Sequence, residues 1–137
     1  METKEKRLTL ESTIAHVRDF HDAFGIENAS QITAKLSEQD YMLRHDLMKE
    51  ENDEYIEACR NNDLVEIADA LGDQLYILCG TILKHGLENK IEEVFLEIQR
   101  SNMSKLGANG KPIYREDGKV LKGENYFKPD IKSILER

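Results

Sequence analysis

The chain has 137 residues, of which 39% are hydrophobic and 34% are charged, a composition typical of one soluble globular domain. No apolar run reaches the ~18 residues that a membrane-spanning helix needs, and no secretory signal follows the basic N-terminus. A formal net charge of −8 argues against nucleic acid as the main partner, because phosphate backbones attract basic surfaces. The two cysteines, Cys59 and Cys79, lie in apolar helical patterns, so we expect buried thiols and a cytoplasmic location.

The charge is divided unevenly along the chain. Residues 1–100 carry a local charge of −11, whereas residues 101–137 carry +3. An acidic body joined to a basic tail suits a site in which carboxylates hold a cation and lysines hold phosphate groups.

Apolar periodicity predicts four helices in the first hundred residues. Gly25 is expected to end the first helix, and Ser37 and Asp63 begin the capping patterns S-x-x-D and D-x-x-E of the second and third helices. The two asparagines at residues 61–62 separate these two helices. The predicted helices cover about residues 14–24, 37–59, 63–86 and 91–98, with a further short helix expected around residues 32–36.

The C-terminal part of the chain has a different character, because it holds both prolines and four of the eight glycines. Residues 113–121 surround an Asp-Gly turn at 117–118, which predicts a short β-hairpin. The expected fold is all-α: an antiparallel helical bundle of four main helices, followed by an irregular tail that contains this hairpin. We expect a single domain over residues 1–137, with a helical core at about 10–103 and a basic tail at about 104–137.

The second and third predicted helices each carry a cluster of acids. Glu50, Glu51 and Glu54 form an E-E-x-x-E pattern, in which Glu51 and Glu54 are neighbours on the helix surface. The acids of the third helix fall within roughly 60° of arc at about 100° per residue. They are Glu66, Asp69 and Asp73.

The short break between these helices predicts an antiparallel hairpin, in which the numbers of facing residues sum to about 124. Glu51 then lies opposite Asp73, and Glu54 lies opposite Ala70 with Asp69 beside it. Like charges that face each other repel. Either these acids point outward into water, or a hard divalent cation such as Mg²⁺ or Mn²⁺ lies between them. The spacing alone leaves both interpretations open.

These residues resemble the MazG-like all-α NTP pyrophosphohydrolase superfamily, which includes phosphoribosyl-ATP pyrophosphohydrolases and dimeric dUTPases. The resemblance rests on the E-E-x-x-E pattern at residues 50–54, on the acidic segment before Gln74-Leu75-Tyr76, and on the tail segments 101–107 and 110–127. The tail is similar to that of one bacterial and phage branch. The likeness covers roughly residues 14–131.

The resemblance implies a metal-dependent enzyme that cleaves a nucleoside triphosphate between its α and β phosphates, with Mg²⁺ as cofactor and Mn²⁺ as a substitute. Glu51 and Glu54 match metal ligands of the first helix, and Glu50 matches a glutamate that orients or deprotonates the attacking water. Asp73 matches the aspartate of the second motif, E-x-x-D.

The second motif departs from the family pattern, because Ala70 stands where its glutamate is expected. Glu66 and Asp69 also satisfy E-x-x-D, but they lie one turn early. The facing argument favours Asp69 and Asp73 as the main ligands, with Glu66 as an outer partner.

Other residues are expected to hold the rest of the substrate. Asn102 and Lys105 resemble the family's N-x-x-K, which binds phosphate, and Lys119 and Lys122 follow on the predicted hairpin. For the base pocket there are two interpretations, base contact or core packing. The residues concerned are Phe20, His21 and Phe24.

Several functions stay open at this point. The resemblance implies a homodimer or homotetramer that acts on nucleoside triphosphates, in a housecleaning role or with a preference for dUTP. Phosphoribosyl-ATP is an alternative substrate. A non-catalytic helical interaction or regulatory module, or a divalent-metal sensor, would carry the same acids without hydrolysing a triphosphate.

Overall fold

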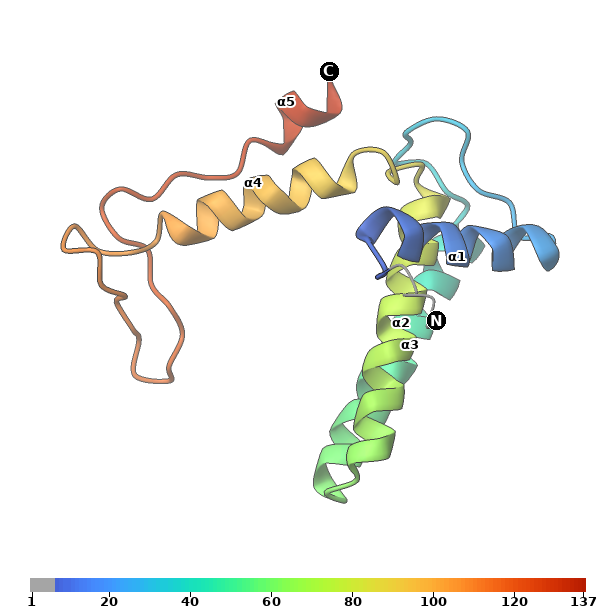
Figure 1. Ribbon diagram of the computed structural model, residues 1–137, viewed down its shortest axis with the longest axis horizontal. Coiled ribbons are helices and arrows are strands. Elements are labelled where there is room, and N and C mark those ends of the chain that lie inside the picture. Colours follow the sequence, from blue (N-terminus) through green and yellow to red (C-terminus); the bar gives the residue numbers. More distant parts are fainter. Residues whose placement is uncertain (1–6) are drawn as a thin grey trace, which may run out of the picture. The chain divides into compact units, whose positions relative to one another are not determined.

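Five helices and their connecting loops make up the part of the chain that the computed structural model describes, residues 7–137 (Figure 1). These residues contain no strand, so the predicted all-α class and the four main helices are confirmed. None of the described helices is both long and apolar enough to cross a membrane. The chain divides after Glu88 into two compact units. The helices are α1 Leu10–Ala23, α2 Glu38–Arg60, α3 Leu64–Lys84, α4 Ile91–Met103 and α5 Ile131–Leu135.

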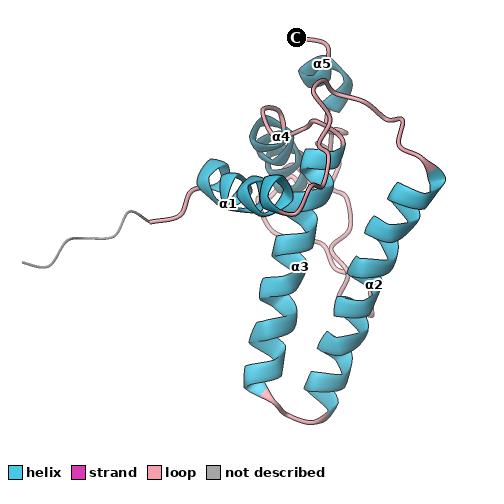
Figure 2. Cartoon of the chain, turned by 90° about the vertical axis from the view of Figure 1, so that its right-hand side faces the viewer, coloured by secondary structure: helices cyan, strands magenta, loops and turns pink. Residues whose placement is uncertain are grey.

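The first unit is built on the antiparallel hairpin of α2 and α3, which lie side by side (Figure 2). Ser37 and Asp63 are the N-caps, as predicted, and Asn62 adopts φ 51° in the turn between the helices. Arg44 Nε donates to Thr81 Oγ1 over 2.9 Å, which agrees to within one residue with the predicted pairing of the two helices. The short turn between α2 and α3 therefore sets which residues of the two helices face each other.

Helix α1 crosses the end of the hairpin that is far from this turn (Figure 1). Ile14 and Val17 are buried there, and the Arg18–Glu88 ion pair of 3.1 Å ties α1 to the chain beyond α3. A capping box at Thr9 and Ser12 begins the helix. These contacts place the inner face of α1 over the upper part of α3.

The short helix predicted around residues 32–36 is wrong. This connection instead bonds to the C-terminal end of α3: Ala29 N–H donates to the carbonyl of Leu83, and Thr33 N–H donates to that of His85. Carbonyl groups at a helix end lack partners within the helix. The loop supplies partners for two of these carbonyl groups, and residues 31–37 form no helix.

Gly86 shows how closely this loop approaches α3. It has φ +70°, and a Cβ at this position would stand 2.5 Å from the backbone oxygen of Gln31. We expect Gly86→Ala to lower the free energy of unfolding by about 1–3 kcal/mol, because backbone strain and a backbone clash combine. Gly72→Ala is the matched control: nothing lies within 4 Å of its added Cβ, so the gain in helix propensity should stabilise by up to about 1 kcal/mol. Urea denaturation measures both, and equal stabilities would contradict the prediction.

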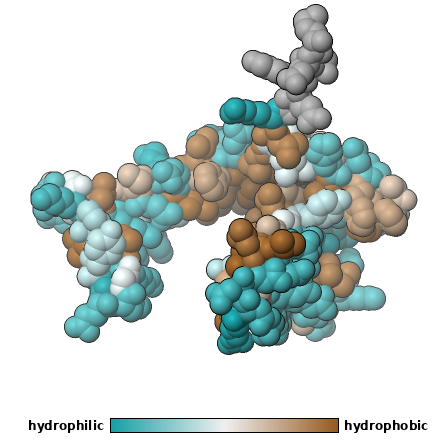
Figure 3. All heavy atoms as spheres, turned by 60° about the horizontal axis from the view of Figure 1, so that its bottom comes forward, coloured by the Kyte–Doolittle hydropathy of each residue, from teal (hydrophilic) through white to brown (hydrophobic). Residues whose placement is uncertain are grey.

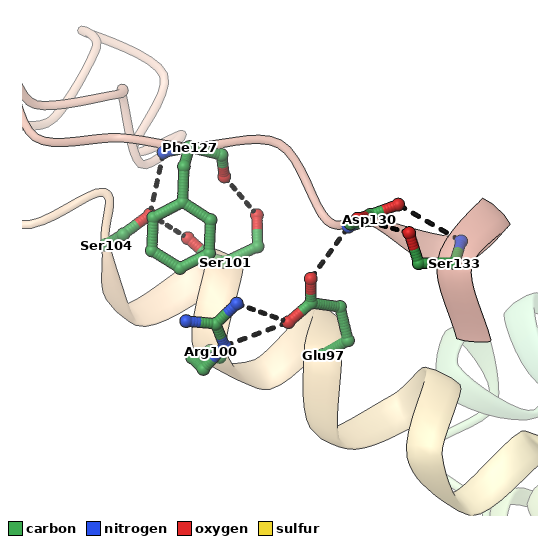
Figure 4. A network of polar contacts seen from close by, with 7 residues as sticks. All are labelled: Glu97, Arg100, Ser101, Ser104, Phe127, Asp130 and Ser133. Atoms are coloured by element: carbon green, nitrogen blue, oxygen red, sulfur yellow. Dashed lines mark hydrogen bonds and ion pairs between the residues drawn. The ribbon is translucent and has the colours of Figure 1, made fainter. Parts of the chain in front are cut away.

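In the second unit the tail folds back along α4 (Figure 4). Ser101, which is 2% exposed, donates from Oγ to the carbonyl of Phe127 over 2.8 Å, and Phe127 N–H donates to Ser104 Oγ. The Arg100 guanidinium lies 4.6 Å from the centre of the Phe127 ring. Glu97 accepts from both Arg100 and the backbone of Asp130. These contacts hold the tail on one face of α4.

The predicted β-hairpin is wrong, because residues 113–121 form no strand. A single antiparallel bridge joins Tyr114 to Val120, and the Asp117 carboxylate takes hydrogen bonds from the Arg115 side chain and the Lys119 N–H. Every residue from 108 to 122 is exposed. A two-stranded ribbon with no face to bury is marginal in water, so only the tight turn and its bridge form.

Helix α5 was not predicted from the sequence. Asp130 caps this helix by accepting from Ser133 N–H, and Ile134 is 5% exposed against the rest of the unit. A D-x-x-S pattern directly after Pro129, followed by two apolar residues, was the available signal.

Candidate active site

Glu51 and Glu54 lie on the face of α2 that packs against α3. They continue the three- and four-residue spacing of Leu47 and Ala58 along this face, and Ala58 is only 4% exposed. Gln74 of α3 reaches toward the carbonyl of Glu51 over 3.4 Å. Glu51 is therefore part of the seam between two helices, not of a solvated outer face.

The environment of Glu51 disfavours its charge. The residue is half-buried, and its Oε2 atom is shielded from solvent without a hydrogen-bond partner. Desolvation raises the pKa of Glu51 most, followed by a hydrogen bond with Glu54. The negative charges of Asp73, Glu54 and Asp69 raise this pKa further, to about 7. The structure thus brings the charges of three other predicted acids within range of Glu51.

The chemistry of this acid cluster, Glu51, Glu54, Asp69 and Asp73, fits a divalent cation. Within residues 7–137, no lysine or arginine forms an ion pair with any of the four. Carboxylate oxygens are the ligands that Mg²⁺ and Mn²⁺ prefer, and a cation would compensate both the repulsion and the unpartnered Oε2 atom. The described side chains do not form a ready-made cage, since no three of them meet at metal-binding geometry. Metal binding by the cluster stays a prediction.

Glu50 and Glu66 lie outside this cluster. Both side chains are exposed, and the backbone N–H of Glu66 serves the cap of α3 by donating to Asp63. Asp69 is exposed as well, whereas Asp73 is half-buried. Glu50 and Glu66 are thus accessible to solvent near the cluster, and the roles predicted for them stay predictions.

A cavity of about 260 Å³ opens between α1, α2 and α3, one helical turn from the acid cluster. Leu47 lines it and lies four residues before Glu51, which is ~6 Å along the helix. Phe20 and Tyr76 also line it and meet edge to face, with ring centres 5.7 Å apart. The volume is slightly below the range of drug-sized ligand sites, which suits a single flat ring system.

Of the predicted base-pocket residues, Phe20 and His21 line this cavity and Phe24 does not. Phe24 stacks on Phe20 at 4.4 Å but is 69% exposed. Arg44 and Tyr76 were not predicted from the sequence, because their place on the wall depends on how α1 crosses the hairpin.

The sequence profile of the phosphoribosyl-ATP pyrophosphohydrolase family matches residues 17–102, more than half of the chain. The chain belongs to this family. Among solved structures it is similar to a protein from Exiguobacterium sp. 255-15 that is provisionally described as an NTP pyrophosphohydrolase, with 24% identity, 96% of each chain covered and a TM-score of 0.51. No curated protein matches the sequence.

Membership confirms the suspected superfamily and makes the chain a nucleotide pyrophosphohydrolase of all-α fold. The matched residues 17–102 include the acid cluster, the cavity-lining part of α1 and Asn102. Its substrate and its metal belong to the proposal below.

The predicted phosphate-binding residues of this pyrophosphohydrolase all lie in the second unit. Gly123 N–H donates to the Lys105 carbonyl over 2.8 Å, which places Lys122 beside Lys105. Lys122 Nζ lies 4.8 Å from the centre of the Tyr126 ring. Asn102 and Lys119 are exposed. The unit thus gathers two lysines near the C-terminal end of α4.

Glu51 makes the stability of the metal-free protein depend on pH. The folded chain keeps this proton up to about pH 7, whereas an unfolded carboxyl loses it near its ordinary value of 4.5. Between these values the folded state binds more protons, so stability falls as the pH rises. We expect Glu51→Gln to raise the Tm relative to wild type in chelator at pH 8 by several degrees, and hardly at pH 4.5.

Differential scanning fluorimetry across pH 4.5–8 measures this difference, with the exposed neighbour Glu50→Gln as control. Mg²⁺ should raise the wild-type Tm more at pH 8 than at pH 5.5, because the ion must displace the proton. A difference in Tm between Glu51→Gln and wild type that does not change with pH would contradict the prediction.

Proposed function

We propose that this pyrophosphohydrolase cleaves (deoxy)nucleoside triphosphates between the α and β phosphates in a Mg²⁺-dependent reaction, releasing the monophosphate and pyrophosphate. The observation that carries the proposal is the acid cluster with its unpartnered Glu51 Oε2, one turn from a cavity of nucleobase size. A nucleotide could bind with its base in the cavity and its triphosphate at the acid cluster, because base and phosphates lie at opposite ends of the molecule. Mn²⁺ would substitute for Mg²⁺.

In this proposal the acid cluster holds the metal through Glu51, Glu54, Asp69 and Asp73, and Glu66 orients the ligands from outside. The bound metal supplies charge neutralisation on the phosphates and a lowered pKa for water. Glu50, which is exposed beside the cluster, accepts the proton of the attacking water.

The phosphates need positive donors in addition. Lys105 and Lys122, which the backbone holds next to each other, are the best candidates, together with Asn102 at the end of α4. Lys119 belongs to the same basic tail. An ammonium group there would bind the leaving pyrophosphate.

The same proposal includes a homo-oligomer, dimer or tetramer. Only eight hydrophobic residues of the described chain are buried, whereas 24 large hydrophobic side chains are exposed on both units (Figure 3). Leu64, Leu71, Leu75 and Leu78 form one stripe on α3, nearly opposite the seam with α2 at ~100° per residue. A stripe of this length rarely faces water in a monomer, and a second copy of the chain would cover it.

The test is pyrophosphate release from canonical, deoxy and modified nucleoside triphosphates and from phosphoribosyl-ATP, with Mg²⁺, with Mn²⁺ and with chelator. We expect release that requires the metal and disappears in Glu54→Gln. The matched control is Asp53→Asn, an exposed acid of the same helix that pairs with Lys49 instead.

The other outcomes select the other functions. Hydrolysis of phosphoribosyl-ATP alone would select the reaction that gives the family its name. A folded protein that binds Mg²⁺ without releasing pyrophosphate would be a metal sensor. A protein that neither binds the ion nor hydrolyses any substrate would be an interaction module.

A further inference from the structure

Arg44 presents an unused hydrogen-bond donor to the cavity. Its Nε donates to Thr81 Oγ1 over 2.9 Å and its Nη2 to the Ile77 carbonyl over 2.7 Å, which fixes the guanidinium plane. Within residues 7–137 no carboxylate forms an ion pair with Arg44, although Asp40 lines the same cavity, and Nη1 has no hydrogen-bond partner. A guanidinium is always a donor and never an acceptor. The cavity wall therefore offers N–H groups at this point.

His21 presents an acceptor to the same cavity. The residue is 2% exposed, and its Nδ1 lies 2.6 Å from Asn28 Oδ1. An amide oxygen can only accept a hydrogen bond, so the Nδ1 atom of His21 carries the proton. The tautomer is assigned from this hydrogen-bond partner. In the neutral ring, Nε2 is then an acceptor.

Gly80 lets the Arg44 guanidinium and the His21 imidazole lie side by side. A Cβ at this position would lie 2.6 Å from Arg44 Nη2 and 3.0 Å from His21 Nε2. Both groups therefore converge on one point of α3 that only glycine leaves free. Any larger residue would move the guanidinium or the imidazole away from the wall.

We propose that this pair selects nucleobases with a carbonyl oxygen next to an imino N–H, namely uracil, thymine and guanine, over cytosine and adenine. Arg44 would donate to O4 or O6, and His21 Nε2 would accept from the adjacent N3–H or N1–H. An amino base presents the reverse order, so its NH₂ would meet the guanidinium and its ring nitrogen would meet the Nε2 lone pair. Phe20 and Tyr76 would contact the faces and edges of the ring.

The inference rests on the proposed function and names its substrate class. A site built to hydrogen-bond one arrangement of donors and acceptors rejects the reverse arrangement strongly, because buried polar groups would be left unpaired. We expect kcat/KM for dUTP to exceed that for dCTP by about 10²-fold. These two substrates differ only at the 4-position and its neighbouring ring nitrogen, so the ratio isolates the pair.

The experiment measures this ratio in the full chain with Mg²⁺, for wild type, Arg44→Lys and Gly80→Ala. Arg44→Lys keeps the charge but loses the fixed fork, and Gly80→Ala keeps the arginine but displaces it. Both should bring the dUTP:dCTP ratio to within about tenfold, whereas Arg60→Lys, at an exposed position of the same helix, should not. A purely structural role would lower both rates and leave the ratio unchanged.

A wild-type enzyme that hydrolyses dCTP as well as dUTP, or a ratio that neither variant moves, would overturn the inference. If Arg44→Lys fails to fold, Gly80→Ala decides alone. If no triphosphate is hydrolysed at all, the proposed function fails separately, and the thermal shift produced by dUMP against dCMP still tests the cavity. A larger shift with dUMP supports the selection, and equal shifts overturn it.

Discussion

Asp73→Asn is expected to lower Mg²⁺-dependent pyrophosphate release by about 10³-fold, which is roughly 4 kcal/mol of transition-state stabilisation. Asp73 is half-buried and its charge acts directly on Glu51, so an amide there removes one of the four carboxylates of the acid cluster. Glu66→Gln should lower the rate by at most about 10²-fold, because an outer partner orients the metal ligands but does not itself bind the metal. Steady-state kinetics at saturating Mg²⁺ measures both.

This ranking decides which residues complete the second acidic motif. The family pattern E-x-x-D fits either Glu66 with Asp69, or an incomplete motif that ends at Asp73 after Ala70. If Glu66→Gln proved the more damaging change, the assignment of Asp73 as a main ligand would be wrong. Far-ultraviolet circular dichroism of both variants should match wild type, since neither carboxylate forms an ion pair with a lysine or arginine in the described chain.

Placing lysines at both Leu71 and Leu75 should dissociate the proposed oligomer and lower the Tm by more than about 10 °C. These side chains are 50% and 49% exposed in the single chain. In a monomer, polar substitutions at such positions change stability by only about 0.5 kcal/mol. In an oligomer the same lysines would be buried without partners, at a cost of several kcal/mol. Sedimentation velocity reports the mass, and thermal melts report the stability.

Ile32→Lys is the matched control, because Ile32 is 43% exposed in the loop between α1 and α2, away from the α3 stripe. It should leave both the mass and the Tm nearly unchanged. A double variant that keeps the wild-type mass would show that the stripe is not the interface. A wild-type protein that sediments as a monomer would overturn the oligomer itself.

Local signals in the chain were sufficient to place the main helices and the register between two of them. Ser37 and Asp63 cap α2 and α3 as expected, because a side chain that accepts from an N–H three residues later needs no distant partner. The short turn at residues 61–63 then determines which residues of α2 meet which of α3. The proximity of Glu51 to Asp73 therefore follows from helix geometry and the length of this turn.

Where secondary structure depended on burial or on distant contacts, the local sequence pattern gave the wrong prediction. Residues 113–121 have the alternation of a hairpin, but their exposure leaves only a turn and one bridge. A helix was expected at residues 32–36, but the Thr33 N–H instead donates to the carbonyl of His85 at the end of α3. Helix α5 was missed because five residues show too little periodicity, and Ile134 is stabilised by packing on its unit.

The sequence by itself determined the all-α class, the four main helices and the acids that resemble a metal site, since each depends on neighbours within a few turns of helix. Only the tertiary structure decided that Glu51 is desolvated while Glu50 is exposed, and that Arg44 and His21 converge over Gly80. The reason is physical: desolvation and cavity shape depend on which surfaces pack against each other, and the crossing of α1 over the hairpin brings together residues that are far apart in the chain.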